Sequence, residues 1–117
     1  MAGHDVEFIA ASAPRDLSRA IEEYAKRRGI LQVIVVPWES SATMLAMAVT
    51  AVNIDGWAIE HTNLGTIHLT DLGSDRTRVV LLGHEPSHPK KDQLVAAFDR
   101  FARQLHDTFR AAASDAD

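Results

Sequence analysis

Hydrophobic and polar positions alternate through the last third of the chain and then give way to helical spacing. Residues 77–82 form a strand-like run, and one long amphipathic segment follows the prolines at 86 and 89. From position 92 onward its apolar side chains recur every three or four residues, which is the period of a helix face. They are Leu94, Phe98, Phe101, Leu105 and Phe109. Such a stripe needs a large apolar partner, and the preceding strands are the candidate.

The first third of the chain predicts a strand followed by a helix. Residues 6–10 have strand composition, and Ser12 is a suitable N-cap for a helix that takes Pro14 in its first turn. Gly29 predicts the end of that helix. Glu22 lies four residues before Lys26, so the pair predicts salt bridging along a solvated outer face.

The middle of the chain predicts two further strands. Residues 31–36 are β-branched and nearly all apolar, so we expect a strand that is covered on both faces and that ends at Pro37. Residues 43–54 have an Ala and Met content that would suit a helix. The Asp55-Gly56 pair that follows favours a type I′ hairpin, so we interpret 43–54 as a strand.

Two more hairpins follow from turn residues. Asn63-Leu64-Gly65 predicts a three-residue loop with Gly65 left-handed, and residues 72–76 predict a second turn. This register pairs Glu60 with His68 and gives one continuous apolar inner face. That face comprises Trp57, Ile59, Ile67, Leu69, Val79 and Leu81.

These elements predict an α+β fold in one domain, residues 1–117, with 111–117 a frayed tail. The predicted order of elements is β-α-β-β-β-β-β-α. About six strands should form a curved and mostly antiparallel sheet that packs against a long C-terminal helix.

Composition and charge exclude several classes of protein. The net charge is −4, and the longest basic run is Lys26-Arg27-Arg28, so we expect neither a nucleic-acid partner nor a membrane surface. The chain has no cysteine, which removes disulfides, thiolate nucleophiles and Cys-zinc sites. The N-terminal segment does not have the pattern of a signal peptide. We therefore expect a cytoplasmic protein that holds no metal and no cofactor.

Three segments resemble the START/Bet v 1-like superfamily (SRPBCC, polyketide cyclase-like), which has the helix-grip fold. Residues 6–17 are similar to its opening strand and Pro-marked helix, residues 65–79 to its last hairpin, and residues 94–109 to its closing helix. The family usually has seven strands, one more than the pattern predicts here. The resemblance implies that a small apolar molecule is held between the sheet and the last helix. Some members catalyse cyclisation, dehydration or hydrolysis there, and others only bind or transport.

Candidate chemistry is sparse. His84 and His88 flank Glu85 with spacing that resembles half a zinc site, but the intervening proline favours a loop before the helix. The predicted pairing of Glu60 and His68 is typical of surface decoration as well as of acid–base chemistry.

His61 is the most interesting titratable residue. Its predicted parity puts it on the inner face at the rim of an apolar pocket, where a histidine can orient a ligand or move a proton. We assign no catalytic residue. The predicted ligand-binding residues are Trp57, Ile59, His61, Ile67, Leu69, Phe98, Phe101 and Leu105. Trp38 is expected to pack against a neighbouring element.

Three functional hypotheses follow. The first is a domain that binds an apolar or aromatic metabolite, and the second is a cyclase- or dehydratase-like enzyme that uses His61. The third is an interaction module with a solid core that forms a homodimer through the outer sheet face. For the first hypothesis, Met44, Ala46 and Ala48 are expected on the inner face, where small or pliable side chains would leave room for a cavity. For the third, a second apolar set faces outward. That outer set comprises Leu45, Met47, Val49, Val80 and Leu82.

Overall fold

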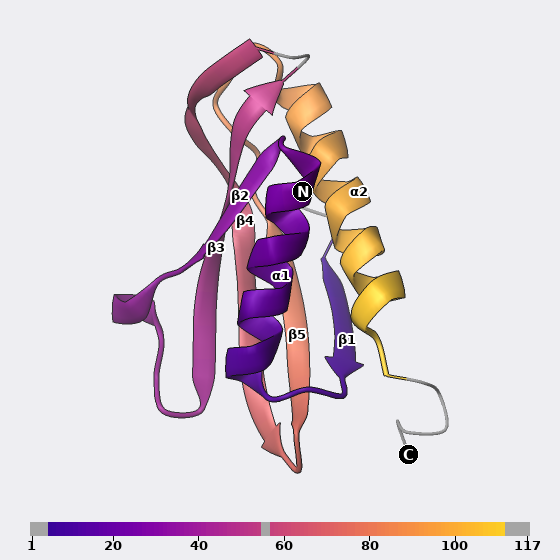
Figure 1. Ribbon diagram of the computed structural model, residues 1–117. Coiled ribbons are helices and arrows are strands. Elements are labelled where there is room, and N and C mark those ends of the chain that lie inside the picture. Colours follow the sequence, from indigo (N-terminus) through magenta and orange to yellow (C-terminus); the bar gives the residue numbers. More distant parts are fainter. Residues whose placement is uncertain (1–4, 55–56, 112–117) are drawn as a thin grey trace.

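The computed structural model describes residues 5–54 and 57–111, and leaves the side chains of 54 and 57–60 undescribed. Its strands form one antiparallel sheet in the order β1-β5-β4-β3-β2 (Figure 1). The elements are β1 (Val6–Ala10), α1 (Pro14–Arg28), β2 (Leu31–Val35), the 3-10 turn η1 (Pro37–Glu39), β3 (Met44–Ile54), β4 (Trp57–Gly73), β5 (Arg76–Gly83) and α2 (Lys91–Phe109). The predicted α+β class with a C-terminal helix is confirmed.

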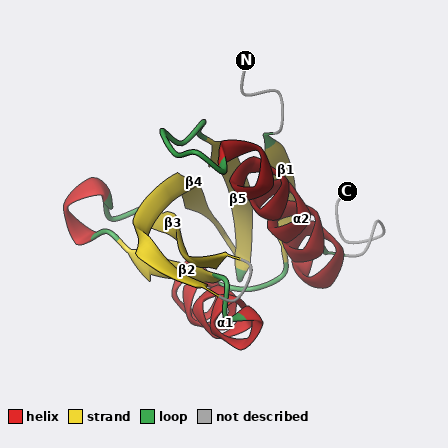
Figure 2. Ribbon diagram, turned by 90° about the horizontal axis from the view of Figure 1, so that it is seen from above, coloured by secondary structure: helices red, strands yellow, loops and turns green. Residues whose placement is uncertain are grey.

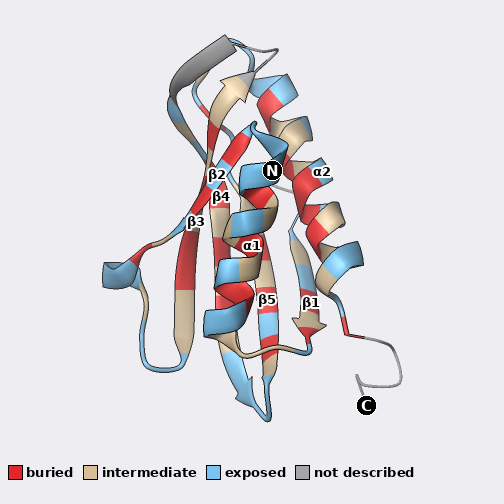
Figure 3. Cartoon of the chain, in the orientation of Figure 1, coloured by how far each residue is buried: buried red, intermediate tan, exposed pale blue. Residues whose placement is uncertain are grey.

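Both helices lie on the same face of the curved sheet (Figures 1 and 2). α1 contacts β2, β3 and β4, whereas α2 contacts β1, β4 and β5. The stripe of α2 that was predicted from its spacing is buried, apart from the half-buried Phe109 (Figure 3). The opposite face of the sheet, called the outer face below, carries no helix of the described chain.

The start of α1 differs from the prediction. The N-cap is Ala13, which makes no side-chain capping hydrogen bond, and Pro14 occupies the first turn as predicted. Ser12 is therefore not the cap. Its carbonyl oxygen instead accepts a hydrogen bond of 2.6 Å from the Thr77 hydroxyl of β5. Gly29 ends the helix in the left-handed conformation, with φ of 75°, as predicted.

β3 confirms residues 44–54 as a strand. Ile54 pairs with Trp57, so the hairpin is also confirmed, although its turn at 55–56 lies outside the described residues. The predicted faces of β3 are reversed. Met47 and Val49 are buried in the core beside the helices. Met44, Ala46 and Ala48, which were predicted to face inward, belong to the outer face. The error arises because nearly every residue of β3 is apolar, so alternation cannot identify the inner side.

β4 joins two predicted strands into one of 17 residues, so the described sheet has five strands rather than six. The Asn63-Leu64-Gly65 segment is not a turn. Val49 pairs with Gly65 and Thr50 pairs with Asn63, which leaves Leu64 as the extra residue of a β-bulge. The bulge is held by the Asn63 side chain, whose Oδ1 accepts a 2.9 Å hydrogen bond from the Gly65 amide.

The β4–β5 hairpin was predicted correctly. Ser74 and Asp75 have φ of 56° and 58°, which are the two positive angles of a type I′ turn. Leu69 pairs with Val79, and Ile67 pairs with Leu81. These side chains face the helices and form the centre of the core.

The two edges of the sheet are finished differently. At β1, the Ala111 amide donates a 2.7 Å hydrogen bond to Ile9, so Ala111 belongs to the folded domain and not to the predicted tail. At the other edge, β2 was expected to be covered on both faces, but Gln32 and Ile34 are exposed. β2 is an edge strand, and α1 covers only one of its faces.

Candidate functional site

Five of the eight predicted ligand-binding residues meet in one place but enclose no described chamber there. Ile67 and Leu69 come from β4, and Phe98, Phe101 and Leu105 come from α2. Each has an exposed fraction of 2% or less, and all belong to a single packed cluster. Side chains packed in this way contact one another instead of a ligand.

Phe98 shows how closely the helix approaches the sheet. A Cβ atom placed on Gly65 would collide with the carbonyl oxygen of Leu82 and with the ring of Phe98. A Cβ atom on Gly83 would lie 3.2 Å from the same ring. The aromatic ring therefore lies over two glycines, which leave room for it.

His61 does not join the predicted walls. Thr62 pairs with Ala51, which belongs to the core, so His61 has the opposite parity and its side chain is exposed. The prediction of an inner-face histidine is wrong because the bulge at Leu64 shifts the alternation of β4 by one residue. The side chains of the other two predicted wall residues of this segment, Trp57 and Ile59, lie outside the described residues.

The other titratable residues that were considered as candidate sites do not come together in the structure. His68 pairs across the sheet with Ala46 and Val80 and not with Glu60, whose side chain is not described. In the loop before α2, Glu85 lies 3.7 Å from Lys91, and the His88 ring accepts a hydrogen bond from the Lys90 amide. No group of described side chains could hold a metal ion.

The η1 turn gives a different result from the expected one. Trp38 is 82% exposed, so the prediction that it packs against a neighbouring element is wrong. The structural role falls to Ser40. Its hydroxyl donates to the Val36 carbonyl at 2.9 Å and accepts from the Ala46 amide at 2.9 Å.

A groove does open beside one predicted wall residue. It lies between the C-terminal end of α1 and the middle of α2, has a volume of about 220 Å³, and reaches Phe101 at its inner side. We call it the interhelix groove. Its lining residues are Arg28, Ile30, Leu31, Ala97, Arg100, Phe101 and Gln104.

The rim of the interhelix groove is cationic and its floor is apolar. Arg28 donates a 2.6 Å hydrogen bond to the Tyr24 hydroxyl and lies 4.8 Å from the centre of that ring. Tyr24 in turn contacts Phe101, with 6.2 Å between ring centroids. These contacts hold one guanidinium group at the rim, and the exposed Arg100 supplies a second from α2. Tyr24 and Arg28 lie four residues apart on one helix, a spacing that by itself indicates that their side chains can meet.

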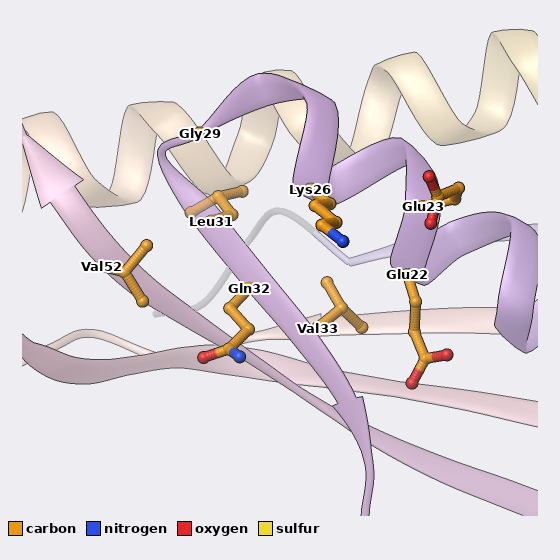
Figure 4. Close-up of a pocket in the computed structure, with 8 residues that line it drawn as sticks. All are labelled: Glu22, Glu23, Lys26, Gly29, Leu31, Gln32, Val33 and Val52. Carbon is orange, nitrogen blue, oxygen red and sulfur yellow. The ribbon is translucent and has the colours of Figure 1, made fainter.

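A second groove, of about 490 Å³, runs between α1 and the edge strand β2 (Figure 4). Leu31, Val33 and Val52 supply its apolar surface. Glu22 and Lys26 reach over it from α1. The ion pair predicted between these two residues is not formed, because their side chains make no salt bridge within the described part of the chain.

The outer face has a small and mainly uncharged centre. Ala48, Thr66 and Leu82 lie side by side across β3, β4 and β5, and the next row holds His68 and Val80. Val80 and Leu82 are half-buried on this face, as their parity predicted.

No family model matches this chain, and no curated protein matches it at the significance that we required. Among the helices of the described residues, none is both long enough and apolar enough to cross a membrane. A function must therefore be inferred from the geometry of the grooves and faces.

Proposed function

We propose that this chain is a small-molecule-binding domain of the helix-grip type, and that its ligand is an apolar or aromatic molecule carrying an anionic group. The observation that carries the proposal is the interhelix groove. It opens beside Phe101, a buried residue that was predicted to line the ligand site, and it has two arginines in its lining.

The chemistry of the groove selects such a ligand. Ile30 is 39% exposed and stands beside Leu31 and Phe101, so an apolar body placed here would remove hydrophobic surface from water. Guanidinium groups pair well with carboxylates because their N–H donors match the two oxygens. A small aromatic carboxylate satisfies both parts of the groove.

The order of elements supports the helix-grip comparison. A strand and a Pro-marked helix open the fold, an antiparallel meander follows, and a long helix lies across the sheet. The ligand position differs from the one first expected. The described side chains between the sheet and α2 form one packed cluster, so we propose the ligand at the interhelix groove and not deeper.

A matched pair of ligands tests this proposal. 1-Naphthoate and 1-naphthamide have the same ring system and differ in charge. Titration of each into the protein, followed by two-dimensional NMR, should shift the signals of Ile30, Arg28 and Arg100 selectively. We expect naphthoate to bind more tightly than naphthamide because only the carboxylate can pair with the arginines.

Substitution of one arginine supplies the second arm. Arg100→Gln should weaken naphthoate binding about fivefold, which is the effect of one partly exposed charge-assisted hydrogen bond, and should leave naphthamide binding unchanged. Arg103→Gln is the control, because Arg103 lies on the same helix but does not line the interhelix groove. Equal effects of the two substitutions, or signal shifts confined to other surfaces, would refute the proposal.

A further inference from the structure

The edge strand β2 has main-chain groups that the described sheet does not use. The Val52 amide donates to the Ile30 carbonyl, and the Val36 amide donates to the Ala46 carbonyl. Even-numbered residues of this segment thus direct their main-chain groups toward β3. Because these groups alternate along a strand, those of Leu31, Val33 and Val35 point to the open edge.

This edge lacks the features that usually prevent pairing. Natural edge strands carry Pro, Lys, a bulge or a covering segment. Leu31–Val35 pairs with β3 without a register shift and contains neither Pro nor Lys. At β1 the end of the corresponding edge is covered, since Ala111 donates to Ile9 and Arg110 forms a bridge to Ala10.

Exposed apolar side chains gather around β2. Among the described residues, the large hydrophobic side chains that remain exposed are Ile30, Ile34, Trp38 and Leu72. The first three flank or belong to this single strand, and Ile34 is 48% exposed within it. An edge strand with such surroundings has both the hydrogen-bonding groups and the apolar surface of an interface.

We propose that β2 pairs with β2 of a second copy of this chain, antiparallel and centred on Val33, so that the two sheets join into one. When the pairing is centred on Val33, the main-chain N–H and C=O groups at the open edge of one copy face those of the other. Val33 faces Val33 of the partner subunit, and Leu31 faces Val35 of the partner subunit. Each of these pairs can exchange both hydrogen bonds of an antiparallel ladder.

Charges beside the edge favour a second copy as the occupant. α1 runs back along β2, with Lys26 near the start of the strand and Glu22 one helical turn away, further along it (Figure 4). The four residues from Glu22 to Lys26 rise about 6 Å, close to the roughly 6.6 Å spanned by two strand residues. A two-fold axis at Val33 therefore brings Lys26 of each copy toward Glu22 of the partner subunit. Neither side chain has an ion pair within the described chain, so both are available.

Disulfide trapping tests the register directly. The chain has no cysteine, and the proposed pairing sets Gln32 opposite Ile34 of the partner subunit in a non-hydrogen-bonded pair, with Cα atoms about 4.5 Å apart. Gln32→Cys and Ile34→Cys proteins are purified separately, mixed, and oxidised mildly. The mixture should form a covalent dimer, and each variant alone should form at least about fivefold less at the same concentration. Equal cross-linking in all three samples would overturn the register.

Charge reversal tests the occupant. Sedimentation velocity of the unmodified chain should show a monomer–dimer equilibrium. Lys26→Glu should raise the dimer dissociation constant about tenfold, because the substitution creates two repulsive contacts related by symmetry. Glu22→Lys should do the same, and the double variant should restore pairing. Because Glu22 and Lys26 lie four residues apart on one helix, the double variant would also restore a contact within one chain. An equimolar mixture of the two single variants should form a heterodimer as well, which a role within one chain would not produce.

Two outcomes would overturn the inference. One is an unmodified chain that stays monomeric up to roughly 100 µM, a range in which even weak dimers associate. The other is a dimer that resists both charge reversals and is abolished by Val80→Lys, which alters the centre of the outer face. That result would assign self-association to the outer face. The inference shares only Ile30 and Leu31 with the interhelix groove, and naphthoate binding in the charge-reversed variants should be unchanged because neither Glu22 nor Lys26 lines that groove.

Discussion

Gly65 controls the distance between the sheet and α2. It occupies the bulged region of β4, where the Leu82 carbonyl and the Phe98 ring together fill the space that a side chain would need. Its φ is not among the positive glycine values of the described chain, which belong to Gly29 and Gly73. Close approach of neighbouring atoms is therefore the reason for glycine here, and backbone conformation is not.

Gly65→Ala should destabilise the fold by about 3 kcal/mol, because the new methyl group must displace either main chain or the Phe98 ring. Urea unfolding followed by circular dichroism measures this change. Gly83→Ala is the matched control, since its added Cβ would lie 3.2 Å from the same ring and requires only a small shift. We expect the control to lose less than about 1 kcal/mol. Similar losses for both variants would show that the Phe98 ring moves away easily.

The sequence drew attention to Gly65 but gave the wrong reason for it. Asn-Leu-Gly is equally compatible with a turn and with a bulge, because the local requirement for a small residue is the same in both. The choice depends on whether residues 57–62 pair with 66–71 or continue along β3. That is a contact between distant segments, which local composition does not encode. The misplacement of His61 followed from the same ambiguity.

At the scale of elements, the hairpin between β4 and β5 is the best-predicted part of the fold. Its register followed from turn residues and from alternation, and both agree with the observed pairs. The turn nevertheless uses Ser74 and Asp75 at two positive φ angles that Asn and Gly adopt more readily.

Replacing Ser74-Asp75 with Asn-Gly should stabilise the protein by about 1 kcal/mol, because it relieves two left-handed residues without altering any core contact. Thermal unfolding at fixed concentration measures the gain. Ser74→Thr should have the opposite effect, since a β-branched side chain is strained at positive φ. A lower melting temperature for Asn-Gly than for the unmodified chain would contradict the type I′ assignment.

β2 and β3 mark the limit of prediction from composition. Both are apolar at nearly every position, so the sequence predicts each of them as a strand. The same composition does not indicate which side of either strand faces the core, or where the strand lies in the sheet. Whether a strand is central or at an edge depends on which segments pair with it. In the candidate site, Phe101 was found from the helical stripe, whereas the two arginines beside it come from different helices that only folding brings together.

For the whole molecule, the contrast between the two sheet edges determines what assembly is possible. One edge is covered at its end, where Arg110 and Ala111 pair with Ala10 and Ile9, and the other is open along β2. A molecule with one open edge that pairs with itself forms a closed two-fold dimer and stops there.

Removing residues 110–117 should change this outcome. The deletion uncovers β1, which gives each molecule two pairing edges, so we expect assemblies larger than a dimer. Sedimentation velocity and light scattering would detect them. A shorter deletion of 112–117 keeps the Ala111–Ile9 hydrogen bond and should leave the assembly state unaltered. Larger species with the shorter deletion would mean that the cover of β1 does not limit assembly.

The single extra residue at Leu64 has a consequence for the evolution and engineering of this chain. Because it adds one residue to β4, the inward-facing residues have even numbers before it, such as Thr62, and odd numbers after it, such as Ile67. Deletion of Leu64 would remove the bulge and would turn residues 61–63 over, so that the exposed His61 and Asn63 would face the helices. A one-residue indel at this site would therefore change which side chains of β4 reach solvent, whereas the same indel in the Ser74-Asp75 turn would lie outside the paired residues of the hairpin.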